Sequence, residues 1–417
     1  MVLIMISLAM FGNYYVYDSI SPLADLLKSQ LGFTDSNIGL LNGIYSLPNI
    51  FMVFIGGIII DRIGTKKSSL LFAALCMAGT LMTTFSGGSL TVMAAGRLVF
   101  GLGSESLIVA ITTVLAKWFK GKELSFAFGI NLTIARLGSF AALNSPTWAE
   151  KLYQTWNGPL FVSTIMALVS VLTVIVYIFM DNRARRIFHL EPESKQDEVV
   201  LSEIFRFNKS FWFIVLLCVT FYSAIFPFQT FAVKFFMEHH ALTRSAAGFA
   251  SSVIILGSMI GTPLFGIFID KKGLRASLMI LGSLMIVPVY LVMNYAPIDP
   301  RWMTALMGIA FSLVPAAMWP SVALIVEERR LGTAYGLMTM IQNIGLTLFN
   351  FLIGWANDFS TADGVTDYSL GMWLFSVTGF LGLFFAFMLR RQETGENRNG
   401  LELGNKELEI FLKEQQV

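Results

Sequence analysis

Twelve apolar runs, each long enough to cross a membrane as a helix, constrain this chain of 417 residues more than any other feature. A membrane-spanning helix needs about 20 mostly apolar residues, and it satisfies its own backbone groups where no water is present. The pattern therefore predicts an all-α membrane protein of twelve transmembrane helices. The runs cover residues 2–25, 37–60, 67–86, 90–117, 122–147, 157–180, 210–237, 244–269, 275–296, 301–326, 331–357 and 369–390.

The composition excludes several classes of function. Charged residues make up 13% of the chain, against about 25% in soluble domains, and no basic stripe suggests nucleic-acid binding. Cys76 and Cys218 lie in apolar runs, so no disulfide framework is expected. The histidines His189, His239 and His240 all fall in predicted loops. We therefore expect no catalytic residues, no metal site and no cofactor.

The distribution of Lys and Arg predicts the orientation of the chain. With the N-terminus inside, 22 of the 29 Lys and Arg residues fall on the cytoplasmic side, five fall outside and two lie within helices. Cytoplasmic loops carry the excess of positive charge in membrane proteins. Both termini are therefore expected in the cytoplasm. The apolar run that starts at Met1 has no basic leader, and we interpret it as the first helix.

An internal repeat divides the chain near its middle. The string Asp61-Arg62-Ile63-Gly64 recurs 209 residues later as Asp270-Lys271-Lys272-Gly273, and Ala127-Phe128-Gly129 recurs after 207 residues as Ala334-Tyr335-Gly336. A duplicated six-helix unit resembles the plan of the major facilitator superfamily of transporters, whose halves flank a midplane site. The expected parts are an N-terminal bundle (1–181), a cytoplasmic linker (182–209), a C-terminal bundle (210–391) and a cytoplasmic tail (392–417).

The repeated loops predict a gate. Gly57 and Gly64 would allow close helix packing and a tight turn, and Asp61 could accept hydrogen bonds in one state of the gate only. The alternative, that these charges merely cap a turn, is weakened by the second copy. Arg97, a buried charge of the fourth helix, is either structural or part of the gate. The predicted gating residues are Gly57, Asp61, Arg62, Gly64, Arg97, Gly266, Asp270, Lys271 and Gly273.

Two opposite charges are predicted at one depth in the membrane. Glu105 and Arg136 each lie about two residues past the centre of helices that run in opposite directions, which places them within roughly 6 Å in height. Ionisable residues within membrane helices are costly and mark function by default. The two are either a structural ion pair or a site for a zwitterion, in which Glu105 takes an ammonium and Arg136 a carboxylate. Tyr17 and Asp18 of the first helix are further candidate ligands.

The second half carries almost no charge at this depth. The repeat places Asn343 opposite Arg136, with Gln342 beside it. Aromatic residues there could form a wall that tolerates different side chains, although aromatic residues in a Phe-rich chain are often plain packing. The candidates for that wall are Tyr222, Phe226 and Trp319.

Several strings resemble the lysosomal dipeptide uniporters of the same superfamily. The most specific are Trp118-Phe119-Lys120-Gly121-Lys122-Glu123-Leu124 and the stretch from Leu331 to Asn343, and similar segments run through most of the membrane domain. They include Tyr45-Ser46-Leu47-Pro48-Asn49, Gly96-Arg97, Glu105-Ser106-Leu107, Ala135-Arg136-Leu137-Gly138-Ser139, Phe226-Pro227-Phe228 and Trp319-Pro320. The resemblance implies facilitated diffusion of dipeptides by alternating access, with Glu105, Arg136 and Trp319 in the binding site.

The expected function is thus uniport of small zwitterions, foremost dipeptides, by a monomer in a lipid bilayer. Another solute on the same scaffold (an amino acid, an organic anion or a metal chelate), with or without proton coupling, is the alternative. A non-transporting receptor or scaffold is a weaker one. No extension precedes the first helix and no glycosylation sequon falls in a predicted outer loop, so we expect a bacterial relative in a plasma membrane, without an accessory subunit.

Overall fold

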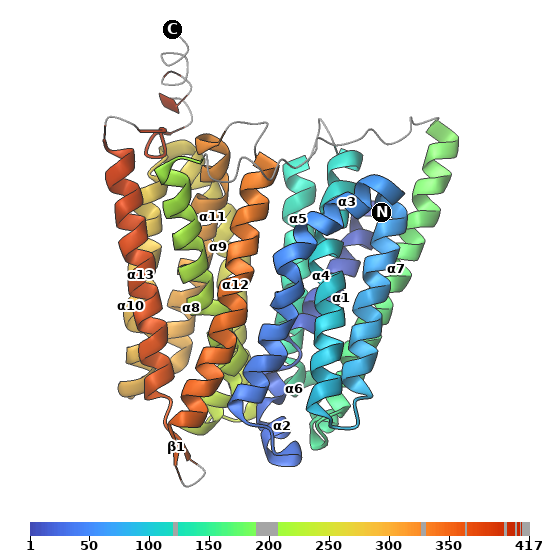
Figure 1. Cartoon of the computed structure of the whole chain (residues 1–417), viewed down its shortest axis with the longest axis vertical. Coiled ribbons are helices and arrows are strands. Elements are labelled where there is room, and N and C mark those ends of the chain that lie inside the picture. The colour runs from blue at the N-terminus through green and yellow to red at the C-terminus, as the bar shows by residue number, and fades with distance from the viewer. Residues whose placement is uncertain are drawn as a thin grey trace. The chain divides into compact units, whose positions relative to one another are not determined.

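The computed structural model describes residues 1–119, 124–188, 207–326, 331–362, 365–395, 398–404, 407, 408 and 410. Almost all of the described chain is helical, as Figure 1 shows. Its elements are α1 (Val2–Asp18), η1 (Ser21–Leu23), α2 (Ala24–Leu31), α3 (Asp35–Thr84), α4 (Leu90–Phe119), α5 (Leu124–Leu143), α6 (Ser145–Trp148), η2 (Glu150–Gln154), α7 (Gly158–Phe188), α8 (Lys209–His239), α9 (Arg244–Lys272), α10 (Arg275–Tyr295), α11 (Pro300–Ile325), α12 (Leu331–Phe359), β1 (Thr361–Ala362), β2 (Val365–Thr366) and α13 (Ser369–Glu393).

The prediction of twelve membrane helices is confirmed. The long helix α3 contains two of the predicted spans, because Gly64 interrupts it with a φ of 81° and a ψ of 158°, a conformation that glycine adopts without steric cost. Among the described residues, nine helical segments are long and apolar enough to cross a membrane. Helix α1 is shorter, with 17 residues, and is apolar.

The predicted end of the first helix, at residue 25, is wrong. Helix α1 stops at Asp18, and the chain continues through η1 into α2. Pro22 has no backbone N–H and cannot continue the hydrogen-bond ladder of α1. The freed carbonyl of Val16 accepts hydrogen bonds from the Ser19 hydroxyl (2.8 Å) and from Arg97 Nη1 (3.2 Å). A buried arginine therefore stabilises this break.

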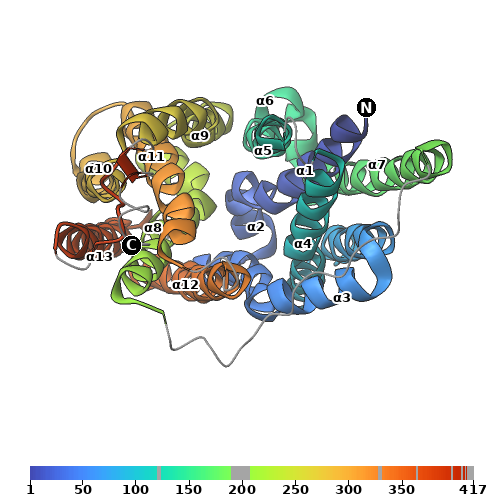
Figure 2. The same cartoon turned by 90° about the horizontal axis from the view of Figure 1, so that it is seen from above.

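The chain forms two compact units that do not coincide with the two sequence halves. Unit 1 comprises Met1–Glu198, Thr230–Ser252 and Asn350–Trp355, and unit 2 comprises the remainder. In unit 1, α1 packs against α5 and α7, and α3 packs against α4 and α7; in unit 2, α10 packs against α11 and α13. Figure 2 shows the helices of each unit end-on. Helix α8 contributes its first part to unit 2 and its last part to unit 1.

The end of the chain packs onto unit 2. The backbone N–H of Arg275 donates to the Leu401 carbonyl (3.0 Å), and the Glu402 carboxylate accepts from the backbone N–H (2.9 Å) and the hydroxyl (2.6 Å) of Ser277. Leu401 is buried, and the buried carboxylate of Glu393 accepts from the Ser210 hydroxyl (2.7 Å). The residues after α13 thus contact the start of α10, and Glu393 at the end of α13 contacts the start of α8.

Candidate functional site

Three charged residues of the predicted binding site lie within electrostatic range of one phenol in unit 1. Tyr14 of α1 interacts electrostatically with Glu105 of α4, Arg136 of α5 and Asp18 at the end of α1. All three charged side chains are half-buried. Glu105 and Arg136 therefore both lie within electrostatic range of Tyr14, and their pairing as a binding site stays a prediction. Tyr14 is a site residue that the sequence analysis left out.

The carboxylate of Glu105 has a tyrosine partner. The hydroxyl of Tyr45, on α3, donates to Glu105 Oε1 at 3.3 Å and lies 3.3 Å from Ser104 Oγ. The ring of Tyr17 contacts the ring of Tyr45, with centroids 4.8 Å apart. Three helices therefore meet at Glu105: α1, α3 and α4.

Arg97 is a buried residue that connects two helices. Its guanidinium donates to the carbonyls of Leu41, Val16 and Tyr17 (3.2 Å each) and to Asn42 Oδ1 (3.1 Å). A planar guanidinium with five donors can hold several carbonyls at once. These acceptors belong to α1 and α3, so Arg97 ties the end of α1 to α3.

The aromatic candidates form one cluster within unit 2. Trp319 Nε1 donates to the Tyr222 hydroxyl at 2.9 Å, and Tyr222 stacks on Phe226 with centroids 5.6 Å apart and an interplanar angle of 7°. Phe311 meets both rings edge-on. Tyr335 stacks on Trp319 with centroids 5.9 Å apart. Trp319 is half-buried and fixed in position by Tyr222, as a preformed contact surface would be.

The two amide candidates lie on α12. Gln342 is half-buried, and its Oε1 accepts from Cys218 Sγ at 3.6 Å. Asn343 is buried, and its Nδ2 donates to the Thr339 carbonyl of the same helix at 3.0 Å. One donor of the Asn343 side chain is therefore used within α12.

The first repeated loop is attached to the end of α7. Lys66 Nζ forms an ion pair with Asp181 Oδ2 (2.9 Å), and Trp118 Nε1 donates to Asp181 Oδ1 (3.0 Å). Arg62 is exposed, while the side chain of Asp61 lies outside the described residues. The gating role of this loop stays a prediction.

The second loop is attached to the end of the chain. Asp270 and Lys271 are exposed, and Gly273 has a φ of 70° and adjoins the backbone of Leu403. The tight turns predicted at Gly64 and Gly273 are thus present. The close helix packing expected at Gly57 is wrong for this conformation, and the same holds at Gly266, because a Cβ at either position would meet open space.

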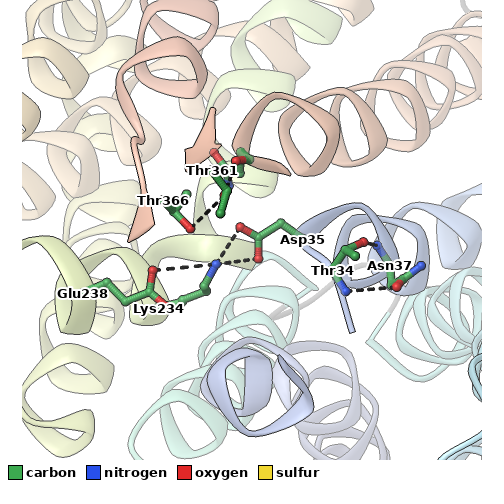
Figure 3. A network of polar contacts seen from close by, with 8 residues as sticks. Thr34, Asp35, Asn37, Lys234, Glu238, Thr361 and Thr366 are labelled. Carbon is green, nitrogen blue, oxygen red and sulfur yellow. Dashed lines mark hydrogen bonds and ion pairs between the residues drawn. The ribbon is translucent and has the colours of Figure 1, made fainter. Parts of the chain in front are cut away.

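A buried ion pair in unit 1 was missed by the sequence analysis. Lys234 Nζ lies 2.6 Å from both oxygens of Asp35, and neither side chain is exposed (Figure 3). Asp35 opens α3 behind a capping box between Thr34 and Asn37, where the helix dipole favours a carboxylate. Glu238 Oε2 lies 3.8 Å from Lys234 Nζ. The signal in the sequence is Lys234 itself, which lies inside the predicted helix 210–237. The distribution of Lys and Arg treats it as one of the five charges on the outer side.

Three other contacts in unit 1 involve α8 and α9: one joins α9 to α2, one joins α8 to α12, and one lies within α8. Arg244 pairs with Asp25, and the Thr230 hydroxyl donates to Asn350 Oδ1 at 2.8 Å. His239 stacks on Phe235 with centroids 5.1 Å apart. In the described part of the chain, no group of three or more His, Cys, Asp or Glu residues could hold a metal ion.

Comparison with known proteins decides the family. The sequence matches the Major Facilitator Superfamily over residues 6–298 and 226–415. The chain belongs to this superfamily. It is therefore a multi-pass integral membrane transporter of a small molecule, and it is not an enzyme. The predicted fold and the prediction of transport are both confirmed.

Within the superfamily, the chain is similar to several individual transporters. It is 31% identical over 366 residues to the lysosomal dipeptide transporter MFSD1 of Homo sapiens, covering 85% of this chain and 79% of the relative. It is 33% identical over 368 residues to MFSD1 of Danio rerio, with the same two coverages. The crystal structure of the nucleoside transporter NupG shares the fold, with a TM-score of 0.73 at 15% identity over 95% of this chain and 100% of NupG.

Proposed function

We propose that the protein transports dipeptides by facilitated diffusion. The observation that carries this proposal is the 31% identity to a dipeptide transporter over 85% of the chain, and it is supported by the opposite charges of Glu105 and Arg136, both within electrostatic range of Tyr14. A dipeptide carries an ammonium at one end and a carboxylate at the other. In our proposal Glu105 binds the ammonium, and Arg136 binds the carboxylate through its planar fork of donors.

We propose that the span between Glu105 and Arg136 suits a dipeptide better than a free amino acid. One residue adds about 3.5 Å to an extended chain, so the charged ends of a dipeptide lie that much farther apart than those of an amino acid. An amino acid that reaches one of the two charges therefore reaches the other poorly. If the site fits a dipeptide, a tripeptide is about 3.5 Å too long, and one of its charged ends would lose its partner.

The remaining candidates are assigned to the side chains of the peptide. Trp319, Tyr222 and Phe226 present aromatic surface that is fixed by their mutual contacts. Aromatic faces bind apolar and aromatic groups without demanding one hydrogen-bond pattern. Asp18, Tyr17, Gln342 and Asn343 are proposed as further polar contacts.

Alternating access is the proposed mechanism, with the repeated loops at Asp61 and Asp270 acting at the gate. Because charged Glu105 and Arg136 can both bind the substrate, no titrating group is needed, and uniport is favoured over proton coupling. The 22 cytoplasmic Lys and Arg residues support cytoplasmic termini. We propose a monomer in the plasma membrane.

Ligand-induced thermal stabilisation of the purified protein tests the proposal. Binding to the native state raises the melting temperature by mass action. We expect dipeptides to raise it in the wild type, amino acids and tripeptides to do so much less, and Glu105→Gln and Arg136→Ala to respond to none. Arg301→Ala, which removes an exposed arginine, is the matched control and should respond like the wild type.

Transport in liposomes completes the test. Wild-type protein should equilibrate a labelled dipeptide across the bilayer without a proton gradient, and Arg136→Ala should not. Normal dipeptide uptake by a folded Arg136→Ala variant would refute the proposed site. If only an organic anion or an amino acid stabilises the protein, it is still a transporter, but its substrate is that solute and not a dipeptide.

A further inference from the structure

Tyr45 contacts Glu105, the residue proposed to bind the substrate ammonium, but it has no role of its own in the proposed site. Its hydroxyl donates to Glu105 Oε1, and it shares a hydrogen bond with Ser104 Oγ, both at 3.3 Å. The Tyr45 side chain is 5% exposed, whereas Glu105 is half-buried. The buried phenol therefore holds one oxygen of a carboxylate that is itself accessible.

The ring of Tyr45 is fixed on several sides. The guanidinium carbon of Arg97 lies 5.6 Å from the ring centroid, and the rings of Tyr17 and Phe100 lie at 4.8 Å and 5.5 Å. A guanidinium near an aromatic ring is attracted by the ring quadrupole. The direction of the Tyr45 hydroxyl is thus set by neighbours on α1 and α4.

Arg97 is in turn fixed by its acceptors. Four hydrogen bonds of 3.1–3.2 Å hold the guanidinium, and the residue is 2% exposed. Two of these bonds reach the last turn of α1, which ends at Asp18. Arg97 therefore connects the end of α1, the ring of Tyr45 and, through Tyr45, the carboxylate of Glu105.

We propose that Tyr45 is a positioning residue for Glu105, and that Arg97 holds Tyr45 in place. This inference rests on the proposed role of Glu105 in binding the substrate ammonium. A carboxylate can accept about four hydrogen bonds, so the bond from Tyr45 leaves acceptor sites on Glu105 for the ammonium. Fixing the carboxylate before the peptide arrives removes an ordering cost from binding. This proposal assigns to Arg97 a structural role in the binding site, which is one of the two roles expected from the sequence.

The variant Tyr45→Phe separates positioning from packing, because it keeps the ring and removes only the hydroxyl. We expect the apo melting temperature to change little and the affinity for dipeptides to fall about tenfold, as for one lost hydrogen bond to a charged group. The KM for dipeptide uptake should rise by the same factor while kcat stays within twofold. The matched control is Tyr290→Phe, which removes a buried hydroxyl that donates to the Ala224 carbonyl in unit 2; it should leave affinity and KM unchanged.

A double-variant cycle with Glu105→Asp tests whether Tyr45 acts through Glu105. Aspartate keeps the charge and draws it back from the Tyr45 hydroxyl, so Tyr45→Phe should weaken dipeptide binding less than twofold in that background. Additive effects of the two substitutions would overturn the proposal, and so would an unchanged affinity of Tyr45→Phe. If Glu105→Gln itself binds dipeptides normally, the proposed function fails instead, and the two failures are distinguishable.

Discussion

Removing one partner of the Asp35–Lys234 ion pair should favour conformations in which the start of α3 separates from α8. In Lys234→Met, the Asp35 carboxylate loses the ammonium that sits 2.6 Å from both of its oxygens. Both side chains are fully buried, and breaking such a pair costs about 3–5 kcal/mol because one charge stays buried without a partner. Only conformations that bury Asp35 bear this cost. Conformations that expose it to water should gain population.

The expected change in the population of open conformations follows from this cost in free energy. A cost of about 3 kcal/mol changes an equilibrium constant by a factor of roughly 150. The double variant Asp35→Asn/Lys234→Met removes both charges, so it should recover most of this change. In Arg301→Met, the exposed pair of Arg301 with Asp299 is lost; exposed pairs contribute about 0–1 kcal/mol, and this control should behave like the wild type.

Thiol labelling measures the shift. Thr230→Cys places a thiol at a buried position next to Asn350, in the same unit as the ion pair. When opening is fast, the labelling rate follows the population of the open state. We expect Lys234→Met to raise this rate by one to two orders of magnitude, and the double variant to restore it. Equal labelling of wild type and Lys234→Met, in folded protein, would refute the reasoning.

Two further predictions concern the second repeated loop and the end of the chain. Gly273→Ala should destabilise the protein by more than about 1 kcal/mol, since φ is positive and a Cβ would clash with the Leu403 backbone, whereas Gly266→Ala should be neutral or slightly stabilising; equal melting temperatures of the two variants would contradict this. Glu402→Ala removes the acceptor for both donors of Ser277 and should cost about 1 kcal/mol, as for a lost helix cap. Amide hydrogen exchange at the start of α10 should then accelerate, and unchanged exchange there would argue against the cap.

The candidate site shows how far sequence reasoning reached. A shared depth for Glu105 and Arg136 can be predicted from the sequence, because both lie in apolar runs whose centres can be located and the rise per residue of a helix is fixed. Their arrangement around Tyr14 was not predictable, because it depends on the rotation of each helix about its axis. The same rotation decides that Tyr45, quoted only as part of a similar string, donates to Glu105.

The sequence by itself determined the number of helices, the duplicated plan and the superfamily, because hydropathy and repeats are local or additive properties that a folded partner does not alter. The tertiary structure alone decided the contact of Arg97 with the end of α1, the burial of Lys234 against Asp35 and the attachment of Leu401 beside Arg275. Each of these joins groups that are distant along the chain. The low dielectric of a packed interior makes a charge depend on its partner, and the identity of that partner is a property of the fold.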